Sequence, residues 1–150
     1  MRIVIQRVTQ ASVTIDNQVK GEIGLGLLLL AGFTAEDTEE DLKWMANKVV
    51  QLRIFSDAED KMNLSVQDVK GDLLVISQFT LFALTKKGNR PSYINAAPPA
   101  MAIPLYERFV TLLEQALGKR VQTGEFGADM KVALLNDGPV TITIDSKNKE

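Results

Sequence analysis

The spacing of apolar residues predicts that the chain begins with short β-strands. Apolar and polar residues alternate imperfectly at first and then more regularly, and Val13 and Ile15 share one face. Asp16-Asn17-Gln18 is typical of a turn, so we expect a meander of three strands: 2–8, 11–16 and 18–23. The continuous apolar run Leu27–Ala31 is typical of a strand that is buried on both faces.

Two segments have the periodicity of amphipathic helices. Thr38 and Asp41 form a capping pair at the start of the first, whose apolar positions are Leu42, Met45, Ala46, Val49 and Leu52. The second spans about 100–117, and Gly118 suits the end of a helix. Its expected buried stripe is Ile103, Tyr106, Phe109, Val110, Leu113 and Leu117.

The remaining apolar segments complete a mixed sheet. Leu73–Ile76 reads as a buried strand that runs on into Ser77–Leu81. Two final strands alternate around 132–134 and 140–144, with Asn136–Pro139 between them. Strands with two inserted helices predict an α+β fold in one domain, residues 1–150, with a mixed, mainly antiparallel, barrel-like sheet and two main helices.

The composition excludes several kinds of catalysis. The chain has no Cys and no His, which removes disulfides, thiolate nucleophiles, imidazole metal sites and the Ser-His-Asp triad. Its net charge of −2 argues against a generally basic nucleic-acid coat protein, but it allows a local basic patch. The longest apolar stretch, Leu25–Phe33, is far shorter than the ~20 residues of a membrane helix, so we expect a cytoplasmic protein with no membrane partner.

The strand end at Ser77, Gln78, Phe79 and Thr80 is the first candidate for chemistry. Hydroxyls at a strand end can act as nucleophiles or as donors to an oxyanion. The same residues also fit ordinary strand-end hydrogen bonding, with Phe79 in the core. The spacing alone favours the second interpretation.

Two loops are the other candidates. Lys86, Lys87 and Arg90 lie close to Tyr93, and a basic loop with an aromatic suits a phosphate backbone and a stacked base. A solvated loop fits equally well. Asn136-Asp137-Gly138-Pro139 is read from its residue types as a hairpin turn, because Asn, Asp and Gly tolerate positive φ. A cis Gly138–Pro139 bond is the alternative.

Taken together and in order, several segments closely resemble the bacterial and eukaryotic D-aminoacyl-tRNA deacylase family along nearly the whole chain. They are Met1-Arg2 to Val8, Arg53-Ile54-Phe55, Lys61–Ser65, Ser77–Thr80, Gly88–Ser92, Phe126–Met130 and Asn136–Thr141. The resemblance implies hydrolysis of the ester that joins a D-amino acid, or glycine mischarged on alanine tRNA, to the 3′ end of a tRNA. It implies a homodimer with shared active sites.

The resemblance also assigns roles to residues. Ser77–Thr80 would line the pocket for the terminal adenosine and its ester. Gly138 and Pro139 would form a cis dipeptide that enters the partner subunit's pocket and rejects L-amino acids, with Arg7 bracing it. Lys86, Lys87 and Arg90 would hold the acceptor end. No metal ligand, obligatory metal or other cofactor is implied.

The implied mechanism uses the ribose 2′-hydroxyl of the tRNA to assist the attacking water, with backbone amides near Phe79 and Thr80 holding the oxyanion. Thr80 as a covalent nucleophile is the competing interpretation, and no residue type here is an obvious base for it. A second hypothesis from another class is a non-catalytic nucleic-acid-binding dimer. Turnover of D-tyrosyl-tRNA distinguishes the two.

Overall fold

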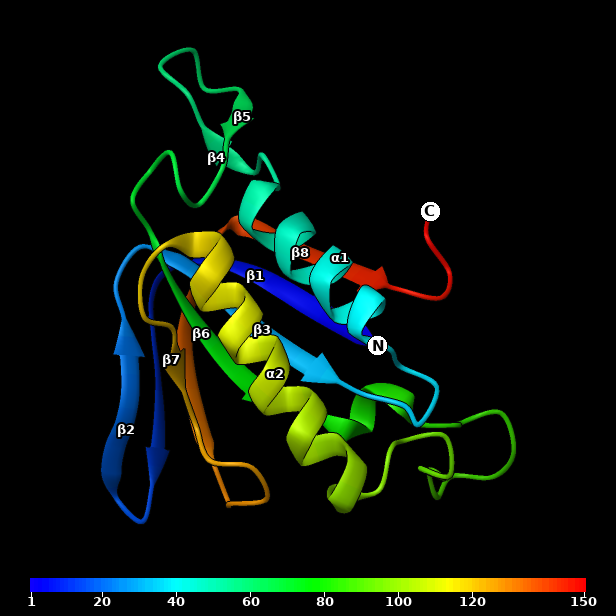
Figure 1. Ribbon diagram of the computed structural model, residues 1–150. Coiled ribbons are helices and arrows are strands. Elements are labelled where there is room, and N and C mark those ends of the chain that lie inside the picture. The colour runs from blue at the N-terminus through cyan, green and yellow to red at the C-terminus, as the bar shows by residue number, and fades with distance from the viewer.

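A computed structural model describes all residues, 1–150. Two helices cover one face of a curled, mixed β-sheet (Figure 1). The strands are β1 (Arg2–Ile15), β2 (Gln18–Ile23), β3 (Gly26–Gly32), β6 (Asp72–Ser77), β7 (Gln122–Thr123) and β8 (Lys131–Asp145), and a small separate hairpin contains β4 (Phe55–Ser56) and β5 (Met62–Leu64). The helices are α1 (Glu39–Gln51), α2 (Pro99–Leu117) and the short 3₁₀-helix η1 (Phe79–Phe82).

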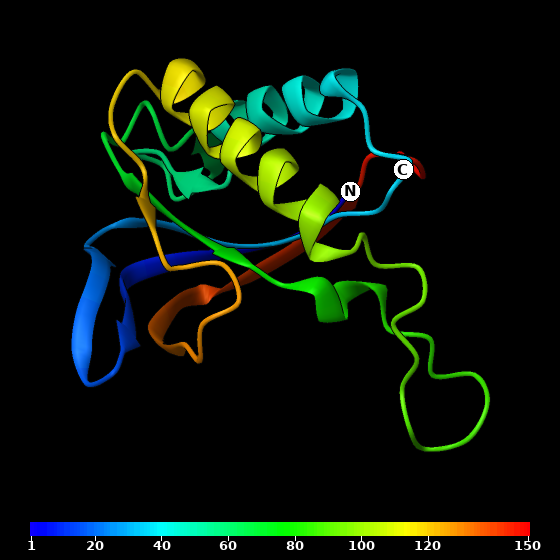
Figure 2. The same ribbon diagram turned by 60° about the horizontal axis from the view of Figure 1, so that its bottom comes forward.

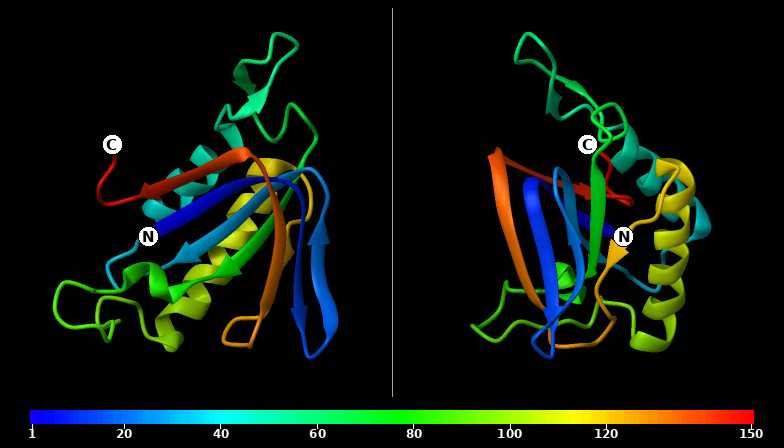
Figure 3. Two further views of the ribbon diagram at one scale, coloured as in Figure 1. Left: turned by 180° about the vertical axis from the view of Figure 1, so that it is seen from behind. Right: turned by 90° about the vertical axis from the view of Figure 1, so that its left-hand side faces the viewer.

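The sheet is antiparallel around β1 and parallel around β6. β1 pairs with β2, β3 and β8 in antiparallel fashion, whereas β6 pairs with β3 and β7 in parallel fashion. β2 curls round toward β7, where a Cβ at Gly21 would lie 2.8 Å from the Thr123 carbonyl oxygen. Figure 3 shows the resulting nearly closed, barrel-like curvature, so the expected α+β fold is confirmed.

The core has two parts, one on each face of the sheet. The larger lies under the helices and contains Ile3, Leu29, Met45, Val75 and Phe109, all almost fully buried. The smaller lies inside the curl and contains Val8, Val13, Leu28, Leu74 and Ile76. Burial on both faces explains the continuous apolar runs of β3 and β6.

The first helix begins directly after its predicted cap, Thr38. The Thr38 hydroxyl accepts a hydrogen bond from the Asp41 amide, and the Asp41 carboxylate accepts one from the Thr38 amide, so the expected capping pair is present. Burial raises the pKa of Asp41, but hydrogen bonds from Lys147 and Thr38 outweigh it and hold that pKa well below its ordinary value. In α2 the Gly118 cap is confirmed, at φ 82°.

Several sequence predictions were wrong in detail. Residues 2–8 and 11–16 form one strand because β8 pairs along nearly all of it. In α2, Ile103 is exposed and Val110 half-buried, while Ala102 and Leu112 take the buried places. Ser77 ends β6, and residues 79–82 turn into η1 instead of continuing the strand. The β4–β5 hairpin and β7 were missed, because two- and three-residue strands carry too few alternations to show a pattern.

The hairpin predicted at Asn136–Pro139 is also wrong. β8 runs through this segment with a bulge: Gln6 pairs with Thr141 and Val8 with Asn136, so residues 137–140 all lie opposite Arg7. The Gly138–Pro139 peptide bond is cis, as the family resemblance implied. Gly138 is the one residue of this segment with a positive φ, 124°, so a glycine that suits a tight hairpin also suits this bulge.

Candidate active site

The first part of the candidate site is the turn that ends β6. Leu73, Leu74, Val75 and Ile76 are buried, and the chain becomes half-exposed at Ser77 and Gln78. The Gln78 amide donates to the Ala31 carbonyl at 2.7 Å, which keeps the turn beside the end of β3. Gly32 makes this close packing possible, because a Cβ there would lie 2.8 Å from the Gln78 carbonyl oxygen.

Within the turn, polar groups converge. The Gln78 side-chain amide donates to the Thr80 hydroxyl. Phe79 and Thr80 begin η1, so their backbone amides have no acceptor inside that helix and remain available to a ligand. The Phe79 side chain is 55% exposed instead of lying in the core, which contradicts the ordinary strand-end interpretation.

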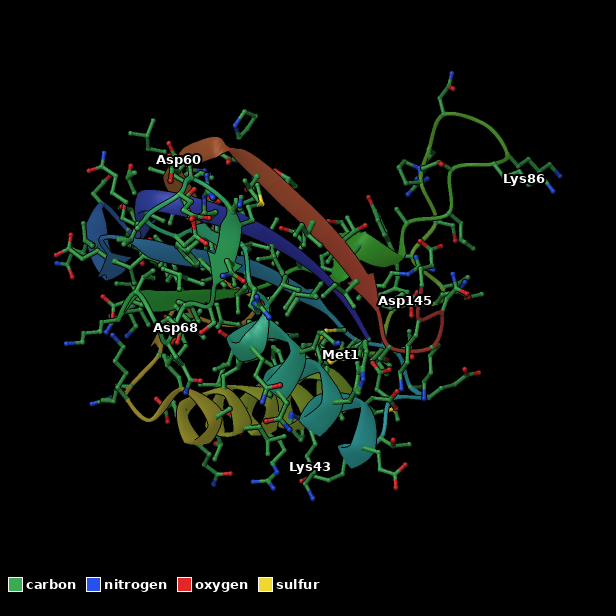
Figure 4. All side chains as sticks on the ribbon, turned by 90° about the horizontal axis from the view of Figure 1, so that it is seen from above. Met1, Lys43, Asp60, Asp68, Lys86 and Asp145 are labelled. Atoms are coloured by element: carbon green, nitrogen blue, oxygen red, sulfur yellow. The ribbon has the colours of Figure 1, made fainter.

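The basic residues stand at the tip of a loop that leaves this turn. Leu84 and Ser92 exchange backbone hydrogen bonds of 2.8 and 3.1 Å, and these close the neck of the loop. Lys86, Lys87 and Arg90 are exposed, and Figures 2 and 4 show the loop standing away from the body with Lys86 at its end.

The same loop returns to the turn through an aromatic pair. The rings of Phe79 and Tyr93 pack edge to face with centroids 5.0 Å apart. Residues 73–106 contain no Asp or Glu, so the turn and the loop form a purely cationic stretch in a chain of net charge −2. This arrangement suits an anionic ligand with stacked bases.

The second part of the candidate site is the bulge of β8. The Arg7 guanidinium is buried and donates to the Asp137 carbonyl at 3.1 Å and to the Ile54 carbonyl at 2.7 Å, and its Nε lies 3.3 Å from the Asp137 carboxylate. Gly138 has φ 124°, and both Gly138 and Pro139 are exposed. A rigid, charged brace therefore holds an exposed backbone segment.

The turn and the bulge do not meet within one chain. Ser77 is in register with Ala31, which pairs with Ile3, whereas the bulge lies opposite Arg7. Four residues along β1 correspond to about 13 Å, and the three strand spacings from β8 to β6 add about 14 Å across the sheet. The turn and the bulge of one chain therefore lie well apart on the sheet.

The sequence prediction missed one contact to the turn. Arg2 of β1 donates from Nη1 to the Leu81 carbonyl at 3.1 Å and from Nε to Asp145 at 2.8 Å. Nothing in its spacing singled it out, because the contact joins residues 79 positions apart. A cavity of about 510 Å³ lies between α1 and β8 and includes Trp44, Lys48 and Ile144. It touches the turn only at Leu81.

The chain matches known proteins along its whole length. Residues 4–145 match the family described as D-Tyr-tRNA(Tyr) deacylase. The D-aminoacyl-tRNA deacylases of Flavobacterium psychrophilum and Bacteroides thetaiotaomicron are 63% and 61% identical to it, and that of Dechloromonas aromatica 58%; each alignment covers all of both chains.

Solved structures share the fold. One titled "c-Myc DNA Unwinding Element Binding Protein" superimposes with a TM-score of 0.90 at 40% identity and covers 97% of this chain and 98% of its own. One titled "Structural Analysis of a probable eukaryotic D-amino acid tRNA deacylase" has a TM-score of 0.83 at 20% identity, with 95% and 97% covered.

The nearly closed mixed sheet with two covering helices is thus the fold of these solved structures, and the full-length relatives are deacylases. The chain belongs to the D-Tyr-tRNA(Tyr) deacylase family. It is an enzyme, a D-aminoacyl-tRNA deacylase of the hydrolase class, as the sequence resemblance predicted.

No helix of the structure combines the length and hydropathy that a membrane crossing needs.

Proposed function

We propose that this enzyme hydrolyses the ester between a D-amino acid and the terminal ribose of tRNA, in the cytoplasm and without an obligatory metal or other cofactor. The observation that carries the proposal is the Gln78–Thr80 turn, where a side-chain amide, a hydroxyl and two free backbone amides surround one exposed strand end. The family match supports the same substrate class.

The proposed catalysis relies on positioning and on the substrate's own hydroxyl. An aminoacyl ester is already activated, so modest stabilisation of the transition state suffices. The amides of Phe79 and Thr80 stabilise the developing oxyanion, and the ribose 2′-hydroxyl assists the attacking water. The chain has no His or Cys to act as the base, and residues 73–106 contain no carboxylate.

The proposed selectivity comes from the backbone of the bulge. Arg7 and Asp137 hold Gly138 and Pro139 in an exposed position, where they enter the partner subunit's turn and block the side chain of an L-amino acid. Glycine has no side chain to block, so glycyl-tRNA(Ala) is also a substrate. The proposal includes a homodimer, because the turn and the bulge lie far apart in one chain and only a second chain can place a bulge against a turn.

The basic loop is proposed to hold the acceptor end of the tRNA. Lys86, Lys87 and Arg90 project from the turn and face phosphates without reading bases, so selectivity does not depend on the tRNA sequence.

Turnover assays test the activity directly. With enzyme far below the substrate concentration, we expect release of D-tyrosine from D-tyrosyl-tRNA and of glycine from glycyl-tRNA(Ala), with L-tyrosyl-tRNA intact. Thr80→Ala should keep substantial activity, whereas a 2′-deoxy terminal adenosine should abolish it. A Thr80→Ala loss of about 10³-fold or more, in a folded protein that still binds tRNA, would favour the covalent nucleophile.

The second candidate is a non-catalytic nucleic-acid-binding dimer. The structure titled "c-Myc DNA Unwinding Element Binding Protein", at 40% identity, favours this alternative. Retarded mobility of tRNA or DNA with no release of D-tyrosine at any enzyme concentration would support it and contradict the deacylase.

A further inference from the structure

We propose that Arg2 is a positioning residue that holds the Phe79–Phe82 turn in its reactive place. The inference rests on the proposed function of Ser77–Thr80. Arg2 itself lies behind the turn, on β1, and its contacts are with Leu81, Phe82 and Asp145.

The guanidinium of Arg2 makes three contacts that together fix the turn. Nη1 donates to the Leu81 carbonyl at 3.1 Å, and Cζ lies 4.6 Å from the centre of the Phe82 ring. Nε donates to the Asp145 carboxylate at 2.8 Å. Leu81 directly follows Thr80, so the first contact acts on the segment that holds the proposed oxyanion amides.

The turn needs such support because its own hydrogen bonds are few. The hydrogen bonds of a four-residue 3₁₀-helix have poor geometry, and its last carbonyls accept no hydrogen bond from within the helix. Within and around it the Leu81 amide donates to Gln78 at 3.3 Å and the Ala83 amide to Thr80 at 3.0 Å. The Leu81 carbonyl is satisfied by Arg2.

Arg2 can act as a brace because its own position is well defined. It lies in register between Gly32 of β3 and Asp145 of β8. The preceding residue is anchored as well: the Met1 ammonium is fully buried, pairs with Asp37 and donates to Ser146 at 2.8 Å. Figure 4 shows Met1 and Asp145 near one another, where β8 ends.

If the Arg2–Asp145 ion pair only stabilised the fold, loss of Arg2 would lower the melting temperature and leave kcat unchanged. The side chains of Arg2 and Asp145 are 47% and 24% exposed, and pairs of this kind contribute little to global stability. Loss of Arg2 should therefore change the reaction more than the melting temperature. Arg108 offers a matched control, since it is 42% exposed and binds Glu39 through two nitrogens on the far helical layer.

The experiment compares Arg2→Gln, Arg2→Lys and Asp145→Asn with Arg108→Gln. We expect Arg2→Gln to lower kcat on D-tyrosyl-tRNA about tenfold or more, with KM within about twofold. Arg2→Lys should retain part of the wild-type kcat. In the double variant with Arg2→Gln and Asp145→Asn, the second substitution should lower kcat little further. Hydrogen exchange of the Ala83 amide should accelerate in Arg2→Gln and not in Arg108→Gln.

An unchanged kcat in a folded Arg2→Gln enzyme overturns the proposal. So does an unchanged Ala83 exchange rate, and so does a raised KM with normal kcat, which would make Arg2 a tRNA phosphate contact. If the wild-type enzyme releases no D-amino acid, the proposed function fails. The exchange of Ala83 in Arg2→Gln and Asp145→Asn then still decides whether Arg2 holds the turn.

Discussion

At the scale of single residues, Gly138 is the position where geometry leaves least freedom. Its φ of 124° is rarely adopted by L-residues, and a Cβ would lie 2.9 Å from Arg7 Nη2 and 3.0 Å from Val140 Cγ2. We expect Gly138→Ala to displace the bulge and to lower the ratio of D- to L-tyrosyl-tRNA hydrolysis by about tenfold or more.

Gly118→Ala is the control for that substitution. Gly118 also has positive φ, at 82°, but nothing lies within 4 Å of a Cβ there. Gly118→Ala should lower the free energy of unfolding by about 1 kcal/mol and leave the ratio of D- to L-tyrosyl-tRNA hydrolysis unchanged. Equal ratios for Gly138→Ala and the wild type would argue against a backbone filter at this position.

At the scale of elements, the start of α1 should make folding sensitive to acid. The pKa of Asp41 is held below its ordinary value of 3.8, so its carboxylate stabilises the folded state above that value and loses this effect as pH falls further. We expect Asp41→Asn to have a free energy of unfolding about 1–2 kcal/mol lower than the wild type at pH 7. When the pH falls below 4, the free energy of unfolding should decrease less in Asp41→Asn than in the wild type.

Chemical denaturation at pH 7 and pH 3 measures both effects. Asp129→Asn is a suitable control, because the Asp129 side chain is 84% exposed and pairs only with Lys131. It should match the wild type at both pH values. An Asp41→Asn protein with wild-type stability at pH 7 would show that the capping contacts contribute nothing.

The basic loop is the second element with a measurable role. Replacing Lys86, Lys87 and Arg90 by Ala should raise KM for full-length tRNA about tenfold. The slope of log KM against log salt concentration should become shallower by roughly 0.7–0.9 for each lost phosphate contact. Hydrolysis of a minimal D-aminoacyl-adenosine should be unaffected, because it carries no backbone phosphates.

A triple variant at Lys20, Lys70 and Arg120 removes the same charge from three other exposed positions. If it raises KM as much as the loop variant does, long-range charge explains the effect and the loop has no specific contact.

At the scale of the whole molecule, the proposed sharing of active sites in a dimer predicts complementation between two damaged chains. One chain carries substitutions at Gln78 and Thr80, and the other carries Gly138→Ala. The homodimer with the substituted turn should hydrolyse D-tyrosyl-tRNA slowly. The Gly138→Ala homodimer should discriminate poorly between D- and L-tyrosyl-tRNA. After the two chains are refolded together in equal amounts, half of the dimers are mixed and each has one intact site, so about a quarter of all sites should regain the wild-type ratio of D- to L-tyrosyl-tRNA hydrolysis.

Simple mixing of the folded homodimers without exchange gives the baseline for that experiment. No recovery after refolding, with mixed dimers confirmed by mass, would contradict the shared site. Leu27, Leu28 and Leu29 of the apolar run are at most 1% exposed within their own chain, so these side chains are not available to a dimer surface.

The sequence by itself determined the elements whose signals are local. The capping pair of α1, the glycine end of α2 and the doubly buried runs of β3 and β6 depend on neighbouring residues and on hydrophobic burial, which periodicity reports directly. The absence of His and Cys likewise limits the chemistry through composition alone, because no arrangement of the chain can supply an imidazole or a thiolate. The resemblance of ordered segments named the family, which the comparisons confirm, and it predicted roles for residues of the turn and the bulge.

The tertiary structure alone decided what depends on pairing between distant segments. Asn136–Pro139 is a bulge and not a hairpin because β1 continues past it on the same side, which no local propensity can report. Phe79 is exposed because β6 stops where β3 stops. The brace of Arg2 on Leu81, and the separation of the turn from the bulge, follow from strand register, since register sets distances that a linear chain does not contain.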